Sequence, residues 1–274
     1  MAGNSFFCNK MGVFVTALNS GSNGNCYYIG NERDSILVDV GISCREVEKR
    51  MKRLALDLKK IRAIFISHEH ADHIRGLRVL SKKYQLPVYI TPKTLAGAKL
   101  FPENPLFVAF RSHETIEVGT LKVKCFPKWH DAADPHSFVV THEEINIGVF
   151  TDIGEPCEHV IEHFKQCHAI FLETNYDDDM LENGRYPYHL KARIKSKNGH
   201  LSNRQAYKLF TDHYSEKLSH LFLSHLSQDN NHPEAVMNLF SRNMNGTKVI
   251  LTSRYEEIPI VEIKEEMKGQ LGLF

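Results

Sequence analysis

The sequence is poor in the features that mark membrane, secreted and disulfide-stabilised proteins. No apolar run reaches the roughly 18 residues typical of a membrane-spanning helix. The first ten residues lack the sustained apolar core of a signal peptide. The six cysteines are scattered without a C-x-x-C pair, which is typical of reduced thiols rather than of a disulfide framework. Together these absences predict a cytoplasmic protein that does not bind membranes.

The sequence also lacks an excess of charge of one sign, internal repeats and proline-rich linkers. Lysine and arginine number 34 against 33 aspartate and glutamate, so no global field attracts nucleic acid and any phosphate binding must come from local patches. A chain of 274 residues is long enough to form an apolar core without disulfides. We expect an N-terminal tail at residues 1–12 and a single domain at residues 13–274.

What the sequence does contain is an alternation of short strand-like and helix-like segments. Runs rich in β-branched and aromatic residues alternate with amphipathic stretches, and this pattern predicts an α/β fold in which helices cover sheets. Between residues 107 and 150 the strand signals crowd together, as in an antiparallel part of a sheet. Other strands are expected at residues 13–18, 26–29, 36–40, 63–67, 88–91, 169–172, 221–224 and 249–251. Helices are expected at residues 44–54, 73–84, 157–167, 188–195, 202–213 and 233–241.

The strongest chemical signal follows the strand expected at residues 63–67. The run H-E-H-A-D-H places His68, His70, Asp72 and His73 between this strand and a helix-like segment. In extended backbone, residues two apart point to the same side, so His68 and His70 can share one ion. Asp72 and His73, at the turn into the helix, are displaced toward a second ion. Imidazole and carboxylate ligands at this spacing indicate a metal site.

These residues match the whole H-x-H-x-D-H signature of the metallo-β-lactamase superfamily, which the sequence resembles. The resemblance implies a four-layer αββα sandwich and a dinuclear metal-dependent hydrolase. The run L-V-D-V-G resembles the family's first motif, in which Asp39 would support the metal loop without binding an ion. Three later runs, W-H-D, T-D-I-G and S-H-L-S, resemble the remaining motifs and add His130, Asp152 and His225.

The ligand set that the resemblance implies divides between two divalent ions. His130 would complete the histidines of the first ion, His225 would join the ligands of the second, and Asp152 would bridge both. Five histidines and two carboxylates suit Zn²⁺, and a site with carboxylates also accepts Mn²⁺. The complete implied set is His68, His70, Asp72, His73, His130, Asp152 and His225.

Two further runs resemble the phosphodiesterase members of the superfamily, such as tRNase Z. Glu173, in F-L-E-T-N, would orient and polarise His200, in G-H-L-S-N, and His200 would contact the scissile phosphate or protonate the leaving oxygen. With S-G-S-N-G-N near the start, G-R-Y-P-Y and H-L-S-Q-D-N-N, these runs resemble the YycJ/WalJ-type family. That resemblance implies a cytosolic bacterial nuclease related to RNase J and tRNase Z, with 5′-to-3′ exonuclease action on DNA favoured over RNA.

Two segments are candidates for contacts to a nucleic-acid substrate. The loop at residues 20–25 either lets a strand approach its glycines closely or is a plain hairpin turn. The basic segment ahead of His200 either binds the phosphate backbone or forms a solvated helix face. The candidate contacts are Ser22, Asn23, Asn25, Arg185, Lys191 and Arg193.

The implied mechanism is in-line attack on a phosphodiester by a hydroxide shared between the ions, with turnover dependent on Asp72, Glu173 and His200. Three alternatives stay open, and the sequence does not indicate the oligomeric state. A small-molecule phosphodiesterase would share every ligand and ignore polymer length. A thioesterase or lactonase of the same fold would not need the Glu173 and His200 pair. A non-catalytic metal-binding or nucleic-acid-binding module would show no turnover.

Overall fold

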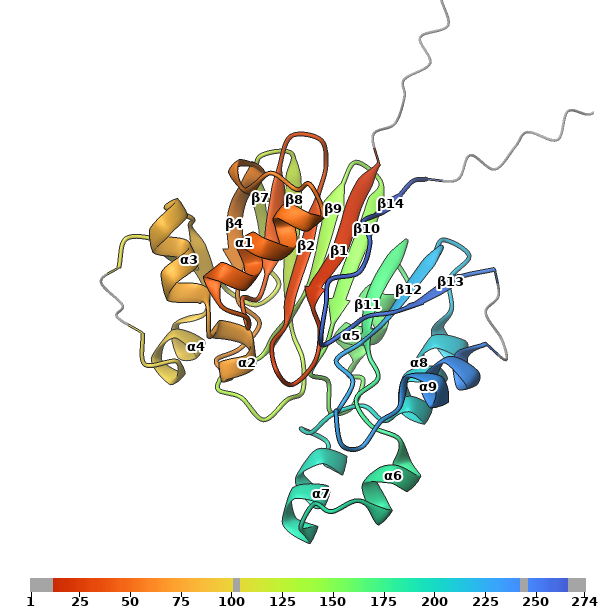
Figure 1. Ribbon diagram of the computed structural model, residues 1–274. Helices are drawn as coiled ribbons and strands as arrows, with labels where there is room; N and C mark the ends of the chain where they lie inside the picture. Colours follow the sequence, from red (N-terminus) through yellow and green to blue (C-terminus); the bar gives the residue numbers. More distant parts are fainter. Residues whose placement is uncertain (1–11, 101–103, 242–245, 266–274) are drawn as a thin grey trace, which may run out of the picture.

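The computed structural model describes residues 12–100, 104–241 and 246–265. The expected N-terminal tail at residues 1–12 therefore lies outside the described residues, apart from Gly12. Within these residues the strands form two sheets of seven strands each, and helices lie against both (Figure 1).

The first sheet has the strand order β14-β1-β2-β3-β4-β5-β6. Strands β14, β1, β2 and β3 pair antiparallel, and the pairs from β3 to β6 are parallel. Its strands are β1 (Val13–Asn19), β2 (Cys26–Gly30), β3 (Ser35–Val38), β4 (Ile61–Phe65), β5 (Val88–Ile90), β6 (Phe107–Ala109) and β14 (Val261–Ile263).

The second sheet repeats this arrangement in the order β13-β12-β11-β10-β9-β8-β7. The pairs from β7 to β10 are antiparallel, and the pairs from β10 to β13 are parallel. Its strands are β7 (Thr115–Val118), β8 (Leu121–Pro127), β9 (His136–His142), β10 (Ile145–Phe150), β11 (Ala169–Glu173), β12 (His220–Ser224) and β13 (Lys248–Leu251).

The helices cover the outer faces of the two sheets, except for a pair that projects at one end. Figure 1 shows α1 and α3 beside the first sheet, α8 and α9 beside the second, and α6 and α7 together at the bottom of the view. The helices are α1 (Cys44–Arg53), α2 (Ala71–Ile74), α3 (Leu77–Tyr84), α4 (Pro92–Gly97), α5 (Glu158–Phe164), α6 (Asp178–Asn183), α7 (Tyr188–Lys195), α8 (Asn203–His213) and α9 (Pro233–Phe240).

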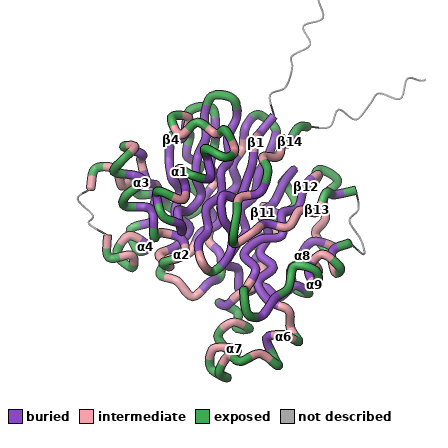
Figure 2. Tube along the Cα trace, in the orientation of Figure 1, coloured by how far each residue is buried: buried purple, intermediate pink, exposed green. Residues whose placement is uncertain are grey.

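Three separate apolar clusters divide the molecule into layers. One cluster lies between the sheets and joins Tyr27 of the first sheet to Phe171 of the second. A second joins the first sheet to α1 and α3 through residues such as Val47, and a third joins the second sheet to α5, α8 and α9 through residues such as Phe210. Figure 2 shows the buried strands between more exposed helices. Helix, sheet, sheet and helix thus form four layers, which confirms the predicted fold class.

The helix expected at residues 73–84 is interrupted, which corrects the prediction from sequence. It begins at Ala71 and breaks after Ile74, and α3 starts afresh at Leu77. A continuous helix needs the Asp72 and His73 carbonyls as acceptors, but these accept instead from the backbone N–H groups of Asn25, at 2.7 Å, and Val40, at 2.8 Å. Because of the break, the segment that carries Asp72 and His73 is hydrogen-bonded to the neighbouring loops.

Other differences lie at the edges of the two sheets. The strand signals at residues 107–150 were expected to form one antiparallel unit, and β7 to β10 do so. Strand β6 instead pairs in parallel with β5 in the first sheet. Helices α4 and α6 and strand β14 were not expected. Among the described residues, no helix is long and apolar enough to cross a membrane.

The packing between the sheets can be tested by replacing one ring at its centre. The Phe171 ring lies 4.9 Å from the Tyr27 ring and 4.5 Å from the Phe222 ring, measured between centroids. Phe171→Ala would leave a cavity there, and we expect it to lower the free energy of unfolding by roughly 3–5 kcal/mol in urea denaturation. Val79→Ala, at a 59% exposed position on α3, is the control and should change stability by less than about 0.5 kcal/mol. Equal effects of the two substitutions would contradict this packing.

Candidate metal centre

The candidate ligands lie at one edge of the molecule, where strands of both sheets end. Strands β3 and β4 of the first sheet and β8, β10, β11 and β12 of the second run so that their carboxyl ends meet at this edge. Each motif found in the sequence lies at or just after one of these ends. The residues brought together there are Asp39, His68, His70, Asp72, His73, His130, Asp152, Glu173, His200 and His225.

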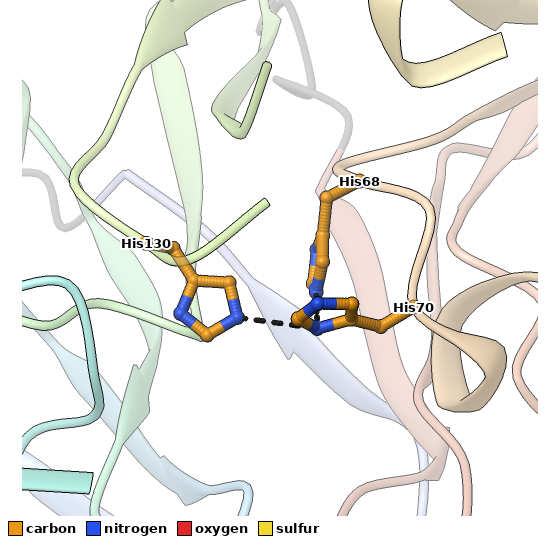
Figure 3. Close-up of side chains that lie close together, drawn as sticks. All are labelled: His68, His70 and His130. Carbon is orange, nitrogen blue, oxygen red and sulfur yellow. Dashed lines mark hydrogen bonds between the residues drawn. The ribbon is translucent and has the colours of Figure 1, made fainter. Parts of the chain in front are cut away.

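Three histidines form the first group of candidate ligands. His68 and His70 come from the segment between β4 and α2, and His130 follows β8. His68 Nε2 lies 3.0 Å from His70 Nδ1, and His130 Nε2 lies 3.4 Å from the same atom. Figure 3 shows the three rings turned toward one another. Their nitrogens are close enough to share one ion.

Asp72, His73 and His225 form the second group. Asp72 Oδ2 lies 3.6 Å from His73 Nε2 and 3.7 Å from His225 Nε2. These separations are too long for hydrogen bonds, yet they leave the three atoms within reach of one cation. His73 and His225 are buried, so free solvent cannot form hydrogen bonds with their Nε2 atoms.

Asp152 faces both groups from the end of β10. Its carboxylate lies 3.2 Å from His73 Nε2, 3.3 Å from His225 Nδ1 and 3.9 Å from His130 Nε2. Only 1% of the residue is exposed. A buried carboxylate between two clusters of imidazoles has the position required to bridge two ions.

Asp39 forms hydrogen bonds to the segment that carries His68 and His73, as the family resemblance implies for a residue that supports the ligands. Its Oδ1 accepts from the Ser67 N–H at 2.8 Å, and its Oδ2 accepts from Ser67 Oγ at 2.8 Å and from His73 Nδ1 at 2.7 Å. Ser67 Oγ in turn lies 2.9 Å from His68 Nδ1. Because the Nδ1 atoms are engaged, the Nε2 atoms of both histidines are left for the centre.

Glu173 has the corresponding role on the second sheet. Its Oε1 accepts from His200 Nδ1 at 2.7 Å and from His225 Nδ1 at 2.9 Å. Its Oε2 accepts from the backbone N–H of Ile153 at 2.7 Å and of Leu201 at 3.2 Å. The predicted contact to His200 is present, whereas the contact to His225 was not expected. One buried carboxylate therefore orients a candidate ligand and a candidate acid together.

The backbone at the site adopts an uncommon conformation at three positions. Asp39, Asp152 and His225 have φ values of 60°, 55° and 57°, in the left-handed region. Asp39 and His225 directly follow the last residue of a strand, and Asp152 follows the end of β10 by two positions, so all three lie at the edge where the candidate ligands gather. Such conformations cost roughly 1–3 kcal/mol each, and they are typical of functional sites.

The electrostatics separate the histidines into two kinds. Burial lowers the pKa of His68 well below its usual range and lowers that of His130 to about 3, so both stay neutral. Burial also acts to lower the pKa of His225, but the carboxylates of Asp152, Asp72 and Glu173 outweigh it and raise the pKa to about 10. The pKa of His73 is likewise raised, against the effect of burial, by its neighbouring carboxylates.

The donor set fits divalent cations. His225 Nε2 is buried and has no hydrogen-bond partner among the described residues, although it points toward Asp72. A buried nitrogen without a partner is costly unless another group binds it. Several carboxylates are buried beside it, and cations would neutralise them. Imidazole nitrogens with carboxylate oxygens suit Zn²⁺ and Mn²⁺ alike.

Two residues that support the candidate ligands were not predicted from the sequence. Ser67 links Asp39 to His68, and Lys128 is buried with its Nζ donating to the Thr151 carbonyl at 2.7 Å. Lys128 thereby holds the peptide that precedes Asp152. The only signal for it was a lysine at the end of a strand, two residues ahead of a candidate ligand.

The structure corrects the expectation for one residue of the loop at residues 20–25. Asn25 is fully buried, and its side-chain oxygen accepts from the Gly21 N–H at 3.0 Å. Its Nδ2 lies 3.1 Å from His73 Nε2. Asn25 therefore shapes the loop behind the metal centre, out of reach of a polymer. Ser22 is exposed and Asn23 is partly exposed.

The basic residues ahead of His200 are largely engaged with the protein itself. Arg193 forms an ion pair with Asp131, next to His130. Lys191 Nζ donates to the Glu182 carbonyl at 2.6 Å. Arg185 is exposed and makes no hydrogen bond or ion pair with the described residues.

The sequence and fold can be compared with those of known proteins. Residues 34–225 match the model of the beta-lactamase superfamily domain. The chain is 35% identical over 228 residues to the exodeoxyribonuclease YycJ of Bacillus anthracis, across 82% of this chain and 86% of that protein. It is 28% identical over 232 residues to the exodeoxyribonuclease WalJ of Streptococcus pneumoniae, across 81% of this chain and 85% of that protein.

Among solved structures, the metallo-β-lactamase fold protein YhfI from Bacillus subtilis superposes with a TM-score of 0.68 at 17% identity. The match covers 90% of this chain and 99% of that chain. The likeness shows that the two proteins share a fold.

The raised pKa values of His73 and His225 predict that metal binding is linked to proton release. Without metal, both imidazoles are protonated on both ring nitrogens at neutral pH. A cation that binds Nε2 must displace the proton on that atom, so affinity for Zn²⁺ should increase as the pH rises. We expect release of about two protons per protein near pH 7 when both groups bind. Calorimetry in buffers of different ionisation enthalpy measures this number.

The matched variants for this measurement are His225→Ala and His113→Ala. The first should reduce the protons released by about one. His113 is exposed and contacts His159 edge to face, so its replacement should change nothing. Metal binding without proton release would contradict the protonation proposed for the centre.

Proposed function

The chain belongs to the beta-lactamase superfamily, and we propose that it is a dinuclear phosphodiesterase that removes nucleotides from the 5′ end of DNA. It is a metal-dependent hydrolase of this fold, as the sequence predicts. What distinguishes the phosphodiesterase proposal from the thioesterase and lactonase alternatives is the chemistry of the residues beside the candidate ligands.

The observation that carries the proposal is the shared contact of Glu173 with His200 and His225. A carboxylate that accepts from both Nδ1 atoms fixes both rings, so His200 is held beside a candidate ligand. His200 is partly exposed, with 20% of its side chain accessible, whereas Glu173 is completely buried. The accessible ring can therefore meet a substrate while its orientation is set from inside the protein.

We assign the first ion to His68, His70 and His130, the second to Asp72, His73 and His225, and a bridging position to Asp152. Ions bound there would activate water as the nucleophile and neutralise charge on the phosphoryl oxygens. The ions are Zn²⁺ or Mn²⁺, since the donor set accepts either.

His200 supplies the proton in this scheme. Its Nδ1–H is donated to Glu173 Oε1, so Nε2 faces outward and can protonate the oxygen that leaves as the phosphodiester breaks. Glu173 acts through His200 by accepting from its Nδ1 and fixing the orientation of its ring. Asp72 acts as a ligand, and Asp39 acts by holding the segment that carries the ligands.

DNA is the proposed substrate because the two relatives described above are named exodeoxyribonucleases and each is matched over most of its length. The candidate strand contacts with accessible surface are Ser22 and Arg185, which are exposed, and Asn23, which is partly exposed. Lys191 and Arg193 could join them only by leaving their present partners. We place the reaction in the cytoplasm, since the five described cysteines are free thiols.

The proposal is tested by incubating the purified, metal-loaded protein with end-labelled single- and double-stranded DNA and RNA. We expect stepwise release of nucleotides from the 5′ end of DNA. His200→Ala should slow this release about a hundredfold or more, the usual contribution of a general acid. His213→Ala, at the opposite end of α8, is the matched control and should retain full activity.

Two outcomes of this assay would overturn the proposal. Inactivity on every polymer together with turnover of a small phosphodiester would identify a small-molecule phosphodiesterase. Hydrolysis of a thioester or lactone that is unaffected by His200→Ala would identify an enzyme that does not use the pair.

The assignment of the second ion predicts the effect of Asp72→Ala. The substitution removes one of the three candidate ligands that serve the second ion alone, so bound metal should fall from two ions to about one per protein, and nuclease activity should be lost. Metal analysis by mass spectrometry and the end-label assay measure the two effects. His73→Ala should behave in the same way. Full activity in either variant would rule out a dinuclear mechanism.

A further inference from the structure

The sequence contains a single tryptophan, and it lies in the loop that carries a ligand of the candidate metal centre. Trp129 directly precedes the candidate ligand His130 and follows the last strand residue of β8 by two positions. It is 36% exposed, whereas most large apolar side chains of the described residues are buried. An indole with part of its surface exposed can contact another molecule through its flat ring.

The side chain of a lysine lies over the ring of this indole. Lys197 Nζ lies 3.3 Å from the centroid of the Trp129 ring, a cation–π contact. Lys197 belongs to the segment between α7 and α8 that also supplies His200. The Trp129 carbonyl accepts from the Gly154 N–H at 2.9 Å, which fixes the backbone beneath the ring.

The same two chain segments form both the metal centre and this contact. His130 Nδ1 donates to the Gly199 carbonyl at 2.9 Å, and the rings of His130 and His200 lie 5.0 Å apart between centroids. Trp129 and Lys197 therefore lie in the same two segments as His130 and His200. The indole thus lies against the segment that supplies His200, and its backbone adjoins the candidate ligand His130.

Lys197 also differs from its basic neighbours in having no carboxylate partner among the described residues. Arg193 is paired with Asp131, and Lys195 with Glu182. A cation–π contact at an exposed position contributes only about 0.5–1 kcal/mol. Lys197 can thus exchange the ring for a phosphate at small cost.

We propose that Trp129 stacks on the base next to the scissile phosphate and that Lys197 moves from the indole to the phosphate backbone when the strand binds. This inference rests on the proposed nuclease function and adds a recognition element to the same site. Stacking on an aromatic ring is sequence-tolerant, because every base has a flat face, and such tolerance suits an enzyme that removes successive nucleotides. The occupant is a single-stranded end, since bases within a duplex are already stacked.

The single tryptophan allows stacking to be observed directly. Intrinsic fluorescence of metal-loaded His200→Ala protein is titrated with a 5′-phosphorylated single strand and with the same strand made abasic at its first two positions. We expect the normal strand to quench the fluorescence strongly and the abasic strand to quench it little. Equal quenching by both strands, or none by either under conditions where filter binding detects the complex, would overturn the inference.

Substitutions separate stacking from structural support of His130. Trp129→Ala should raise the Kd for the normal strand about five- to a hundredfold, the range measured for base–aromatic stacking, and leave the Kd for the abasic strand unchanged. Trp129→Phe should restore most of the affinity, and metal content should match that of the unchanged protein in both. Tyr255→Ala, at an exposed aromatic position in another loop, is the control and should leave both affinities unaltered.

The role of Lys197 is tested through salt dependence. Loss of one phosphate contact reduces the slope of log Kd against log salt concentration by about 0.7 for a single strand. Lys197→Gln should therefore lower the slope by about this amount, and an unchanged slope would remove Lys197 from the inference. If no polymer is hydrolysed or bound, the proposed function itself fails. If polymers are hydrolysed and neither Trp129→Ala nor the abasic strand has an effect, only the stacking proposal fails.

Discussion

The site depends on two buried carboxylates, one from each sheet, that accept hydrogen bonds from Nδ1 atoms of the histidines around them. Asp39 of the first sheet holds His73 directly and His68 through Ser67. Glu173 of the second sheet holds His200 and His225. Each contact engages an Nδ1 atom and leaves the Nε2 atom of that ring for the centre at the edge where the strands end. The packing of the two sheets therefore sets the geometry of the centre, because neither sheet carries both anchors.

This arrangement is costly for the protein without cations. Carboxylates are buried beside histidines, three residues of the site have left-handed backbone, and a buried ring nitrogen of His225 lacks a hydrogen-bond partner among the described residues. Protons on His73 and His225 balance part of the negative charge in the absence of metal, as their raised pKa values indicate. Metal ions replace these protons and satisfy the unpaired nitrogen, so the same groups that destabilise the empty centre favour divalent cations. Bound metal should consequently contribute to the stability of the fold as well as to catalysis.

The sequence predicted local features well, because each motif lies at or just after a strand end and carries its ligands within a few residues. The fold class and the family are confirmed, and the structure brings the predicted ligands together. Contacts between distant segments could not be read in this way. The bond of Glu173 to His225 joins positions 52 residues apart, and the burial of Asn25 follows from its packing behind His73. The break in the helix after Ile74 likewise depends on carbonyls that accept from distant loops rather than on local propensity.

The basic segment ahead of His200 shows why charge in a sequence is an incomplete guide to binding. As a run of lysine and arginine it predicts phosphate contacts, yet ion pairs and backbone contacts within the protein already occupy Arg193, Lys195 and Lys191. These bonds attach α7 to its surroundings, and Arg193 reaches Asp131 beside the metal ligand His130. The helix thereby holds the following segment, with Lys197 and His200, against the centre. The charges of α7 thus bind within the protein, while Lys197, which follows the helix, lies over an aromatic ring and has no carboxylate partner among the described residues.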